Sequence, residues 1–282
     1  MKIVILGAAG FLGTKLMNLL SKENEVIGAS LDSLEENIES VDATDKFQLY
    51  NFLNSKKPGV VIDLIALTSS VACEQNPELC KKLNFETAKN IAEICKELNA
   101  KMIFVSSSYV FDGKKGDFTE EDTTSPLNEY GKYKVLAEKE VLKLKNSIIL
   151  RTAIMYGYNG KNKPNGVFNK ILSGEDIPLG DPDQLRNPLL VDDVALIITS
   201  LLTLNQAGIF HMAGPNKLSM FDFLTSLEQI LRKDSKIIIN KNAPSLVVHP
   251  KNDTLNTSKL NSFGIKTHSL QEGLQILKNQ IN

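Results

Sequence analysis

Short runs of apolar residues alternate along the chain with longer stretches in which apolar positions recur at helical spacing. The apolar runs predict strands at Lys2–Leu6, Glu25–Ala29, Val60–Ile65, Lys101–Ser106, Ser147–Arg151 and Gly208–Met212. The longer stretches predict helices at Phe11–Ser21, Asp45–Asn54, Pro77–Leu98, Glu129–Lys145, Val194–Leu204, Phe221–Arg232 and Leu270–Lys278. Strands separated by helices of this length are typical of βαβ units, and unbroken apolar runs suit strands covered on both faces. The pattern predicts an α/β fold with a doubly wound parallel sheet.

The regular alternation loosens after Arg151. Residues Gly157–Pro188 are rich in Gly, Pro, Asn and Asp, which is typical of loops. We therefore expect a cofactor-binding domain over residues 1–153 and a smaller C-terminal lobe for the substrate over residues 154–282, with the segments of the two interleaved.

Composition narrows the classes of function. The 282 residues are 42% hydrophobic and 23% charged, and the net charge of -1 favours neither nucleic acid nor an anionic membrane as a partner. The N-terminal apolar run is too short for a signal peptide, and no segment reaches the length of a membrane-spanning helix, so a cytoplasmic location is expected. Three widely spaced cysteines, Cys73, Cys80 and Cys95, fit reduced thiols better than a disulfide framework or a metal site.

A glycine-rich loop joins the first predicted strand to the first predicted helix. Gly7, Gly10 and Gly13 have the spacing GxxGxxG. Gly7 permits a tight turn, Gly10 lets the backbone approach a pyrophosphate, and Gly13 allows the helix to pack closely on the strand. Together with the free N–H groups of the helix start, around Phe11 and Leu12, this context predicts a Rossmann-type dinucleotide site.

A possible acid–base pair follows one βα unit after a cluster of serines. Tyr130 and Lys134 form YxxxK and lie on one face of a predicted helix. An ammonium near a phenol is expected to lower the pKa of the phenol, so that Tyr130 can exchange a proton with a substrate oxygen. Ser107, at the carboxyl end of the preceding strand, can hydrogen-bond a carbonyl and help to polarise it.

In this order the glycine loop, the serine cluster and YxxxK resemble the extended short-chain dehydrogenases, and more closely the dTDP-4-dehydrorhamnose reductase family. The segments VSSSYVFDG (105–113) and PLNEYGKYKVLAE (126–138) carry the strongest similarity. Further similar segments follow in family order, namely VDATD (41–45), ALTSSVACEQNPELCKKLN (66–84), ILRTAIMYG (149–157), DQLRNPLLVDDVA (183–195), GIFHMAGP (208–215) and PKNDTLNTSKL (250–260). The resemblance covers nearly the whole chain.

The resemblance implies roles for particular residues. Ser107, Tyr130 and Lys134 would be catalytic, with Lys134 also holding the nicotinamide ribose. Asp42 and Ala43 would line the adenine, and Ala66, Leu67 and Thr68 would run beneath the cofactor. Arg186 would lie on the substrate side, where its planar donors suit a diphosphate.

Three positions depart from the family's pattern. Tyr133 stands where the family has Ser or Thr, Ile154 where many members have Trp, and His249 where Arg is common. The last two belong to the substrate lobe, so they weaken any assignment of one particular sugar.

The resemblance predicts an NAD(P)H-dependent reductase of a 4-keto sugar nucleotide, with dTDP-4-dehydrorhamnose as the leading substrate. One alternative is a sugar-nucleotide epimerase or dehydratase, although a dehydratase has an Asp-Glu pair where Ser108 and Tyr109 follow Ser107. Another is a non-catalytic partner, because the beta subunit of methionine adenosyltransferase resembles the same family and keeps a similar YxxxK. Besides the sugar nucleotide, a second copy of the chain in a homodimer is left open as a partner.

The position at the end of the second strand bears on the choice of cofactor. An acidic residue there hydrogen-bonds the ribose hydroxyls of NAD, whereas this chain has Ser30, which does not repel a 2′-phosphate. Asp32 lies two residues on and competes for the role, and no Arg stands nearby. The pattern favours NADP over NAD.

His211 is expected to be a packed core residue, and Asp192 and Asp193 are expected to cap a helix rather than bind a metal.

Overall fold

A computed structural model describes residues 1–32, 37–158, 170–171, 173–231, 235–240 and 245–281. Part of the predicted loop region Gly157–Pro188 and the predicted helix end at Arg232 lie outside these residues. Within the described ranges, no helix combines the length and the apolar character needed to cross a membrane.

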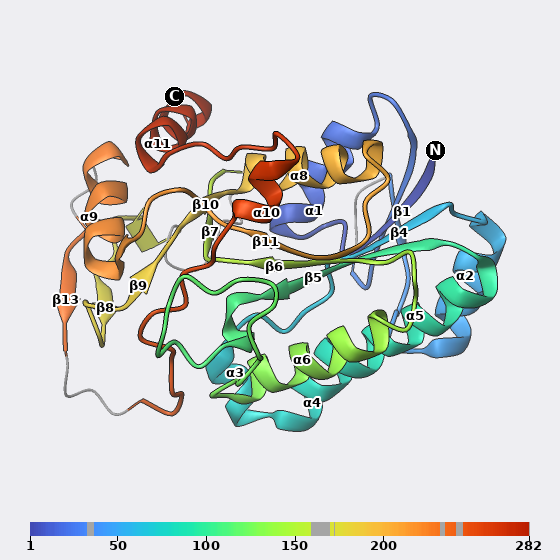
Figure 1. The fold of residues 1–282 in the computed structure, drawn as a ribbon, viewed down its shortest axis with the longest axis horizontal. Coiled ribbons are helices and arrows are strands. Elements are labelled where there is room, and N and C mark those ends of the chain that lie inside the picture. Colours follow the sequence, from blue (N-terminus) through green and yellow to red (C-terminus); the bar gives the residue numbers. More distant parts are fainter. Residues whose placement is uncertain (33–36, 159–169, 172, 232–234, 241–244, 282) are drawn as a thin grey trace.

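A parallel sheet forms the centre of the molecule (Figure 1). Its strand order in the described part of the chain is β11-β6-β5-β4-β1-β2-β3. The strands are β1 (Lys2–Leu6), β2 (Glu25–Ser30), β3 (Ile38–Ser40), β4 (Val60–Asp63), β5 (Lys101–Ser107), β6 (Ile148–Thr152) and β11 (Gly208–Met212). The order reverses direction between β1 and β4, which is the point where an open α/β sheet binds its ligands.

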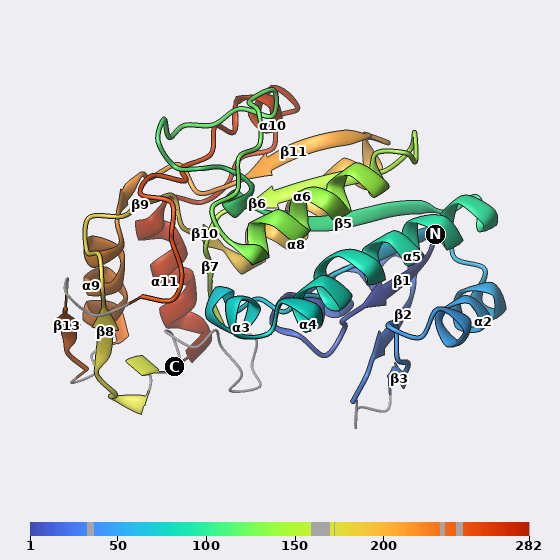
Figure 2. The same cartoon turned by 90° about the horizontal axis from the view of Figure 1, so that it is seen from below.

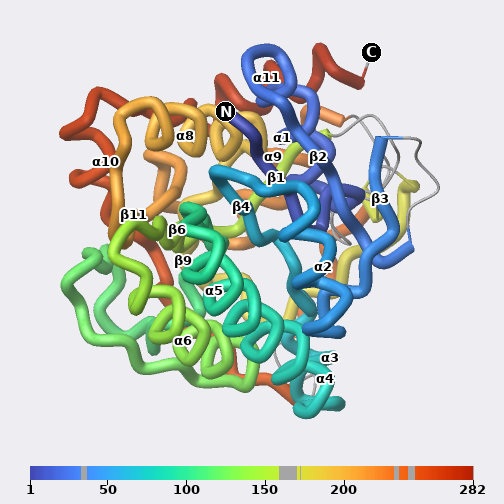
Figure 3. The backbone as a smooth tube through the Cα atoms, turned by 90° about the vertical axis from the view of Figure 1, so that its right-hand side faces the viewer, coloured from blue at the N-terminus to red at the C-terminus, as the bar shows by residue number. Residues whose placement is uncertain are grey.

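Helices cover both faces of this sheet. Figure 3 shows the strands between two helical layers, with α1 (Phe11–Leu20) and α8 (Val191–Thr203) on one side. On the other side lie α2 (Lys46–Lys56), α5 (Thr87–Leu98) and α6 (Glu129–Val141). Alternate strand residues feed two separate apolar cores: Ile3 and Ile5 face α1 and α8, whereas Val4 and Leu6 face the other layer. The predicted doubly wound α/β fold is confirmed.

The second half of the chain contributes to the sheet and also builds a separate body. Helix α8 packs on α1, and β11 pairs with β6 along its whole length, so residues beyond 153 complete the first half. Most of the remaining elements gather at one end of the molecule around a third apolar core (Figure 2), whereas α10 (Ser258–Ser262) packs on β11. They include α9 (Met220–Leu231), α11 (Leu270–Ile281), β7 (Met155–Tyr156), β8 (Ile177–Leu179), β9 (Leu185–Arg186), β10 (Leu189–Leu190), β12 (Leu218–Ser219) and β13 (Ile237–Ile239). The division at residue 153 stays a prediction, and the two halves share the sheet.

The single helix predicted over Pro77–Leu98 is wrong in detail. The segment consists of α4 (Pro77–Lys81), a π-helical turn (Lys82–Glu86) and α5, and it follows a short helix, α3 (Ser70–Gln75), that was not predicted. The π turn carries Asn84, whose side chain hydrogen-bonds both the N–H and the carbonyl of Leu67 at 3.0 and 3.2 Å. The turn thereby fixes the loop that follows β4.

A buried ion pair holds α6 against the sheet. Both Arg151, on β6, and Glu138, on α6, have side chains that are 4% exposed. Arg151 Nη2 and Nε donate to the carboxylate at 2.8 and 3.0 Å, and the Ser106 hydroxyl of β5 donates to it at 2.6 Å. Because the charges are paired and the carboxylate oxygens are satisfied, the pair fixes how α6 lies across β5 and β6.

Candidate active site

The glycine loop leaves β1 in a conformation that requires glycine. Gly7 has a φ of 83°, and the N–H groups of Gly7 and Ala8 both donate to the Ala29 carbonyl at 2.8 and 3.1 Å. A Cβ on Gly13 would lie 2.5 Å from the Gly7 and Ala8 carbonyl oxygens, so only glycine lets α1 approach the loop this closely.

The start of α1 suits an anion. Gly10 is its N-cap, no side chain caps it, and its first turn has no acidic residue. The N–H groups of Phe11, Leu12 and Gly13 precede the first helical hydrogen bond, which Thr14 donates to Gly10 O at 3.1 Å. The Leu12 side chain is buried in the core and that of Phe11 is partly buried against it, so the polar groups that this turn offers to a ligand are backbone N–H groups. The loop fits the phosphates of a dinucleotide.

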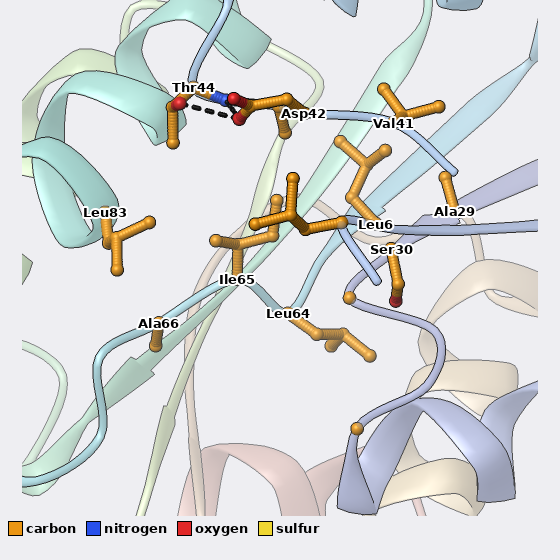
Figure 4. A pocket seen from close by; sticks show the side chains of 14 residues that line it. Leu6, Ala29, Ser30, Val41, Asp42, Thr44, Leu64, Ile65, Ala66 and Leu83 are labelled. Atoms are coloured by element: carbon orange, nitrogen blue, oxygen red, sulfur yellow. Dashed lines mark hydrogen bonds between the residues drawn. The ribbon is translucent and has the colours of Figure 1, made fainter. Parts of the chain in front are cut away.

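A cavity of about 280 Å³ lies beside this loop, at the carboxyl ends of β1, β2 and β4 (Figure 4). Six of the predicted cofactor-binding residues line it: Gly7, Gly10, Ser30, Asp42, Ala43 and Ala66. The other predicted residues do not: Phe11, Leu12, Gly13, Leu67, Thr68, Tyr130 and Lys134. The other lining residues were not predicted: Leu6, Ala29, Leu31, Val41, Thr44, Leu64, Ile65 and Leu83. Most of them adjoin a predicted residue in the sequence. Extending each motif by one residue would therefore have predicted them.

Two polar side chains mark the cavity. The Ser30 hydroxyl accepts a hydrogen bond from the Ala9 N–H at 3.0 Å, which ties the end of β2 to the glycine loop. The Asp42 carboxylate accepts from the Thr44 hydroxyl and N–H at 2.6 and 2.9 Å (Figure 4). These hydrogen bonds hold the pKa of Asp42 below its usual value, so a fixed anion lies at this end of the cavity.

The three predicted catalytic residues come together at the ends of β5 and α6. Asn128 caps α6 by accepting from the Gly131 N–H at 3.0 Å, which places Tyr130 in the first turn. Lys134 Nζ donates to the Val105 carbonyl at 2.9 Å and lies 5.9 Å from the centroid of the Tyr130 ring. Ser107, the last residue of β5, is buried and hydrogen-bonds Tyr130.

The expected lowering of the pKa of Tyr130 is wrong for this structure. Burial raises the pKa of Tyr130, and the hydrogen bond with Ser107 opposes that rise only in part. Burial also lowers the pKa of Lys134 to about 8, against the opposing effects of Asp63 and Glu138. The ammonium is engaged with the Val105 carbonyl, and the phenol remains a protonated acid at neutral pH.

Arg186 does not present an open guanidinium. It is 3% exposed, and its Nη1 donates to Asp253 Oδ1 at 2.7 Å and to the Pro250 carbonyl at 3.1 Å. Nη2 donates to Gln184 Oε1 at 3.1 Å. The donors expected to hold a diphosphate are therefore bonded within the chain, and that role stays a prediction.

Sequence reasoning missed an aromatic pair beside Tyr130. The ring of Tyr109 meets that of Tyr130 edge-on, with centroids 5.9 Å apart. The Tyr109 hydroxyl hydrogen-bonds His249 Nδ1 at 3.0 Å, although 140 positions separate the two residues. The neighbouring Ser108 hydroxyl donates to Asp253 at 2.6 Å. Tyr109 belongs to the recognised segment 105–113, whereas no sequence signal joined it to His249.

His211, Asp192 and Asp193 form hydrogen bonds or ion pairs within the chain. His211 is fully buried and hydrogen-bonds the Phe118 carbonyl at 3.0 Å, as a packed residue. Asp192 and Asp193 lie in the first turn of α8 rather than at its cap, and they bond Lys15 at 2.9 Å and His268 at 2.6 Å. In the described part of the chain, no group of three His, Cys, Asp or Glu side chains could hold a metal ion.

Comparison with known proteins gives a consistent set of similarities. The model of the family described as RmlD substrate binding domain matches residues 1–282. A dTDP-4-dehydrorhamnose reductase from Aggregatibacter actinomycetemcomitans is 29% identical and covers 98% of both chains. Methionine adenosyltransferase 2 subunit beta from Rattus norvegicus is 28% identical over 94% of this chain and 83% of that protein. The crystal structure of a dTDP-4-dehydrorhamnose reductase from Clostridium acetobutylicum is 29% identical, with a TM-score of 0.87 and coverage of 100% and 99%.

Gly10→Val tests the phosphate loop. A Cβ there meets only the Gly7 carbonyl oxygen, at 3.1 Å, so the fold should survive while the branched side chain occupies the approach to the helix start. We expect the affinity for a nicotinamide dinucleotide, measured by calorimetric titration, to fall at least about tenfold, or roughly 1.4 kcal/mol. Gly180→Val, at an exposed glycine with open space around it, is the matched control and should bind normally. Unchanged affinity in folded Gly10→Val would remove the loop from the site.

Arg186→Ala distinguishes a structural role of Arg186, as the partner of Asp253, from the predicted role in holding the diphosphate of the substrate. The substitution leaves the buried carboxylate of Asp253 without its cation. The free energy of unfolding measured in urea should then fall by about 3–5 kcal/mol. Unchanged stability together with a raised Michaelis constant for the substrate alone would instead support the diphosphate role.

Proposed function

The chain belongs to the RmlD substrate binding domain family, and on this basis we propose that it reduces the keto group of a sugar nucleotide. It is an NAD(P)-dependent oxidoreductase with the Rossmann fold of the extended short-chain dehydrogenases. The arrangement of Ser107, Tyr130 and Lys134 at the carboxyl edge of the sheet, the edge that also carries the phosphate loop, is the observation that carries the proposal.

Each of the three residues has a distinct part in the proposed reaction. A bound nicotinamide dinucleotide supplies the hydride that reduces the carbonyl carbon. The Tyr130 hydroxyl gives its proton to the carbonyl oxygen, and burial keeps that hydroxyl protonated until it is used. Ser107 hydrogen-bonds the same oxygen and orients it, while Lys134 holds the ribose next to the reacting group.

We propose dTDP-4-dehydrorhamnose as the substrate, which gives dTDP-L-rhamnose as the product. The family and the Aggregatibacter relative support this choice. Ile154 packs against the apolar core of the second half, and His249 lies beside Tyr109. Because both positions depart from the family's pattern, other 4-keto sugar nucleotides belong in the same assay.

We propose NADP as the preferred cofactor. Ser30 lines the cavity at the end of β2, and it carries no charge that would repel a 2′-phosphate. Asp32 is exposed two residues further on. The dissociation constant of NADPH, measured by fluorescence titration, should be lower than that of NADH. A lower constant for NADH would reverse the assignment.

A regulatory subunit is the second candidate, because methionine adenosyltransferase 2 subunit beta is 28% identical to this chain. The two functions differ in what they require of Tyr130. A reductase loses its acid when the hydroxyl is removed, whereas a regulatory partner keeps its association. If no 4-keto sugar nucleotide turns over while the dinucleotide binds, and a synthetase co-purifies in stoichiometric amount, the regulatory function is favoured.

Tyr130→Phe tests the proposed chemistry. The substitution keeps the ring and removes the proton donor, so kcat should fall by roughly two to four powers of ten, the scale of general acid–base catalysis. Cofactor affinity should change little. Tyr133→Phe, on the same helix, removes a hydroxyl that has no part in the proposed reaction and should retain kcat. Substrate reduction by Tyr130→Phe at the wild-type rate would show that another group is the acid.

A further inference from the structure

A buried carboxylate beneath the candidate active site has no part in the proposed proton transfer. Asp63 is the last residue of β4 and is 1% exposed. Its Oδ1 accepts a hydrogen bond from the Ile65 N–H at 3.0 Å. Its Oδ2 is buried and has no hydrogen-bond partner among the residues that the structure describes. A buried carboxylate with an open oxygen is unfavourable unless a cation lies nearby.

The position of Asp63 in the sheet puts such a cation within its reach. Residues alternate between the two faces of β4, and Val61 packs in the core beneath α5 and α6, so Asp63 faces that same layer. In the neighbouring strand Asp63 is paired in register with Phe104. Lys134 Nζ lies 4.6 Å from the centroid of the Phe104 ring and donates to the carbonyl of the next residue, Val105. The carboxylate and the ammonium thus both lie beside Phe104 of β5.

The other ionisable groups around this pair do not supply a free charge. Glu138, one turn further along α6, is engaged by Arg151 and Ser106. The thiol of Cys95, on α5, is buried and has a raised pKa, as does that of Cys73, on α3, so both are neutral. The thiol of Cys80, on α4, is also fully buried. Among the described groups, Asp63 is the carboxylate near Lys134 that no other cation compensates.

The charges of the two groups depend on each other. Burial lowers the pKa of Lys134 to about 8, and Asp63 is the foremost of the charges that oppose the fall. Burial raises the pKa of Asp63 to about 6, and Lys134 opposes that rise. Both groups are therefore charged between about pH 6 and pH 8. Without Asp63, burial would neutralise Lys134 at a lower pH.

We propose that Asp63 is a positioning residue, the buried counter-ion that keeps Lys134 a cation and holds its ammonium at the catalytic edge of the sheet. Asp63 touches neither cofactor nor substrate and acts only through Lys134. The catalytic meaning of this pair rests on the proposed function. The pairing itself does not, so it can be tested in the protein without any sugar nucleotide.

Asp63→Asn keeps the shape of the side chain and removes its charge. In protein labelled with ¹³C-lysine, the signal of Lys134 Cε is identified by its absence from Lys134→Arg, and its titration is followed by NMR. The midpoint should lie near pH 8 in the wild type and at least about one pH unit lower in Asp63→Asn, the effect of losing an adjacent opposite charge. Glu140→Gln removes a partly buried carboxylate of the same helix, which pairs with Lys143, and should leave the midpoint unchanged.

An unchanged Lys134 midpoint in folded Asp63→Asn would overturn the pairing. Should Asp63→Asn not fold, Lys134→Met provides the reciprocal measurement. Loss of the cation should raise the titration midpoint of the Asp63 carboxyl, followed by its ¹³Cγ signal, and an unchanged midpoint would equally overturn the pairing.

In turnover assays the alkaline limb of kcat/KM should move to lower pH in Asp63→Asn by the same amount as the Lys134 midpoint. A purely structural defect would lower the rate at every pH and leave the limb in place. If no sugar nucleotide turns over in the wild type, the proposed function fails while the NMR titrations still decide the pairing.

Discussion

The ion pair between Glu138 and Arg151 fixes the element on which the candidate site depends. Helix α6 carries both Tyr130 and Lys134, and it lies across β5 and β6 with the pair between them. Two buried charges carry a large desolvation cost, which excellent geometry and further hydrogen bonds offset here. The hydroxyl of Ser106 also donates a hydrogen bond to the Glu138 carboxylate. Strand β5, which ends in Ser107, and helix α6, which begins beside Tyr130, therefore have one defined orientation. The orientation of α6 on β5 therefore sets the position of the Tyr130 hydroxyl, the proposed acid.

The two ends of the candidate site offer different kinds of interaction to a ligand. Around the glycine loop the chain offers backbone N–H groups and the dipole of α1, neither of which titrates. At the end that holds Tyr130 and Lys134 it offers buried side chains whose charges depend on one another: Lys134 donates to the Val105 carbonyl, and Asp63 is the foremost charge that opposes the effect of burial on its pKa. Binding of phosphates should accordingly vary little over the pH range in which Asp63 and Lys134 change their charges.

The sequence predicted the central sheet because each of its long strands is a continuous apolar run bounded by helical spacing. Strands of two or three residues, such as β7 or β12, have no periodicity to detect, and their pairing depends on contacts made only after folding. The glycine loop and YxxxK could be recognised in the sequence because the residues of each motif lie only a few positions apart. The partners of Arg186 and Tyr109 were not, since Asp253 and His249 lie 67 and 140 positions away. For the same reason the pKa of Tyr130 was misjudged: adjacency on a helix was visible, and burial was not.

The strand order has a consequence for the growing chain. The edge strand β11 and the covering helix α8 come from residues 191–212, whereas the rest of the sheet is complete by residue 152. While a ribosome adds the residues between, β6 presents an open edge and α1 lacks its neighbour. An unpaired strand edge is a template for aggregation, and at about 5–20 residues per second this interval lasts several seconds. Protection of the nascent chain is therefore needed most between the emergence of β6 and that of β11.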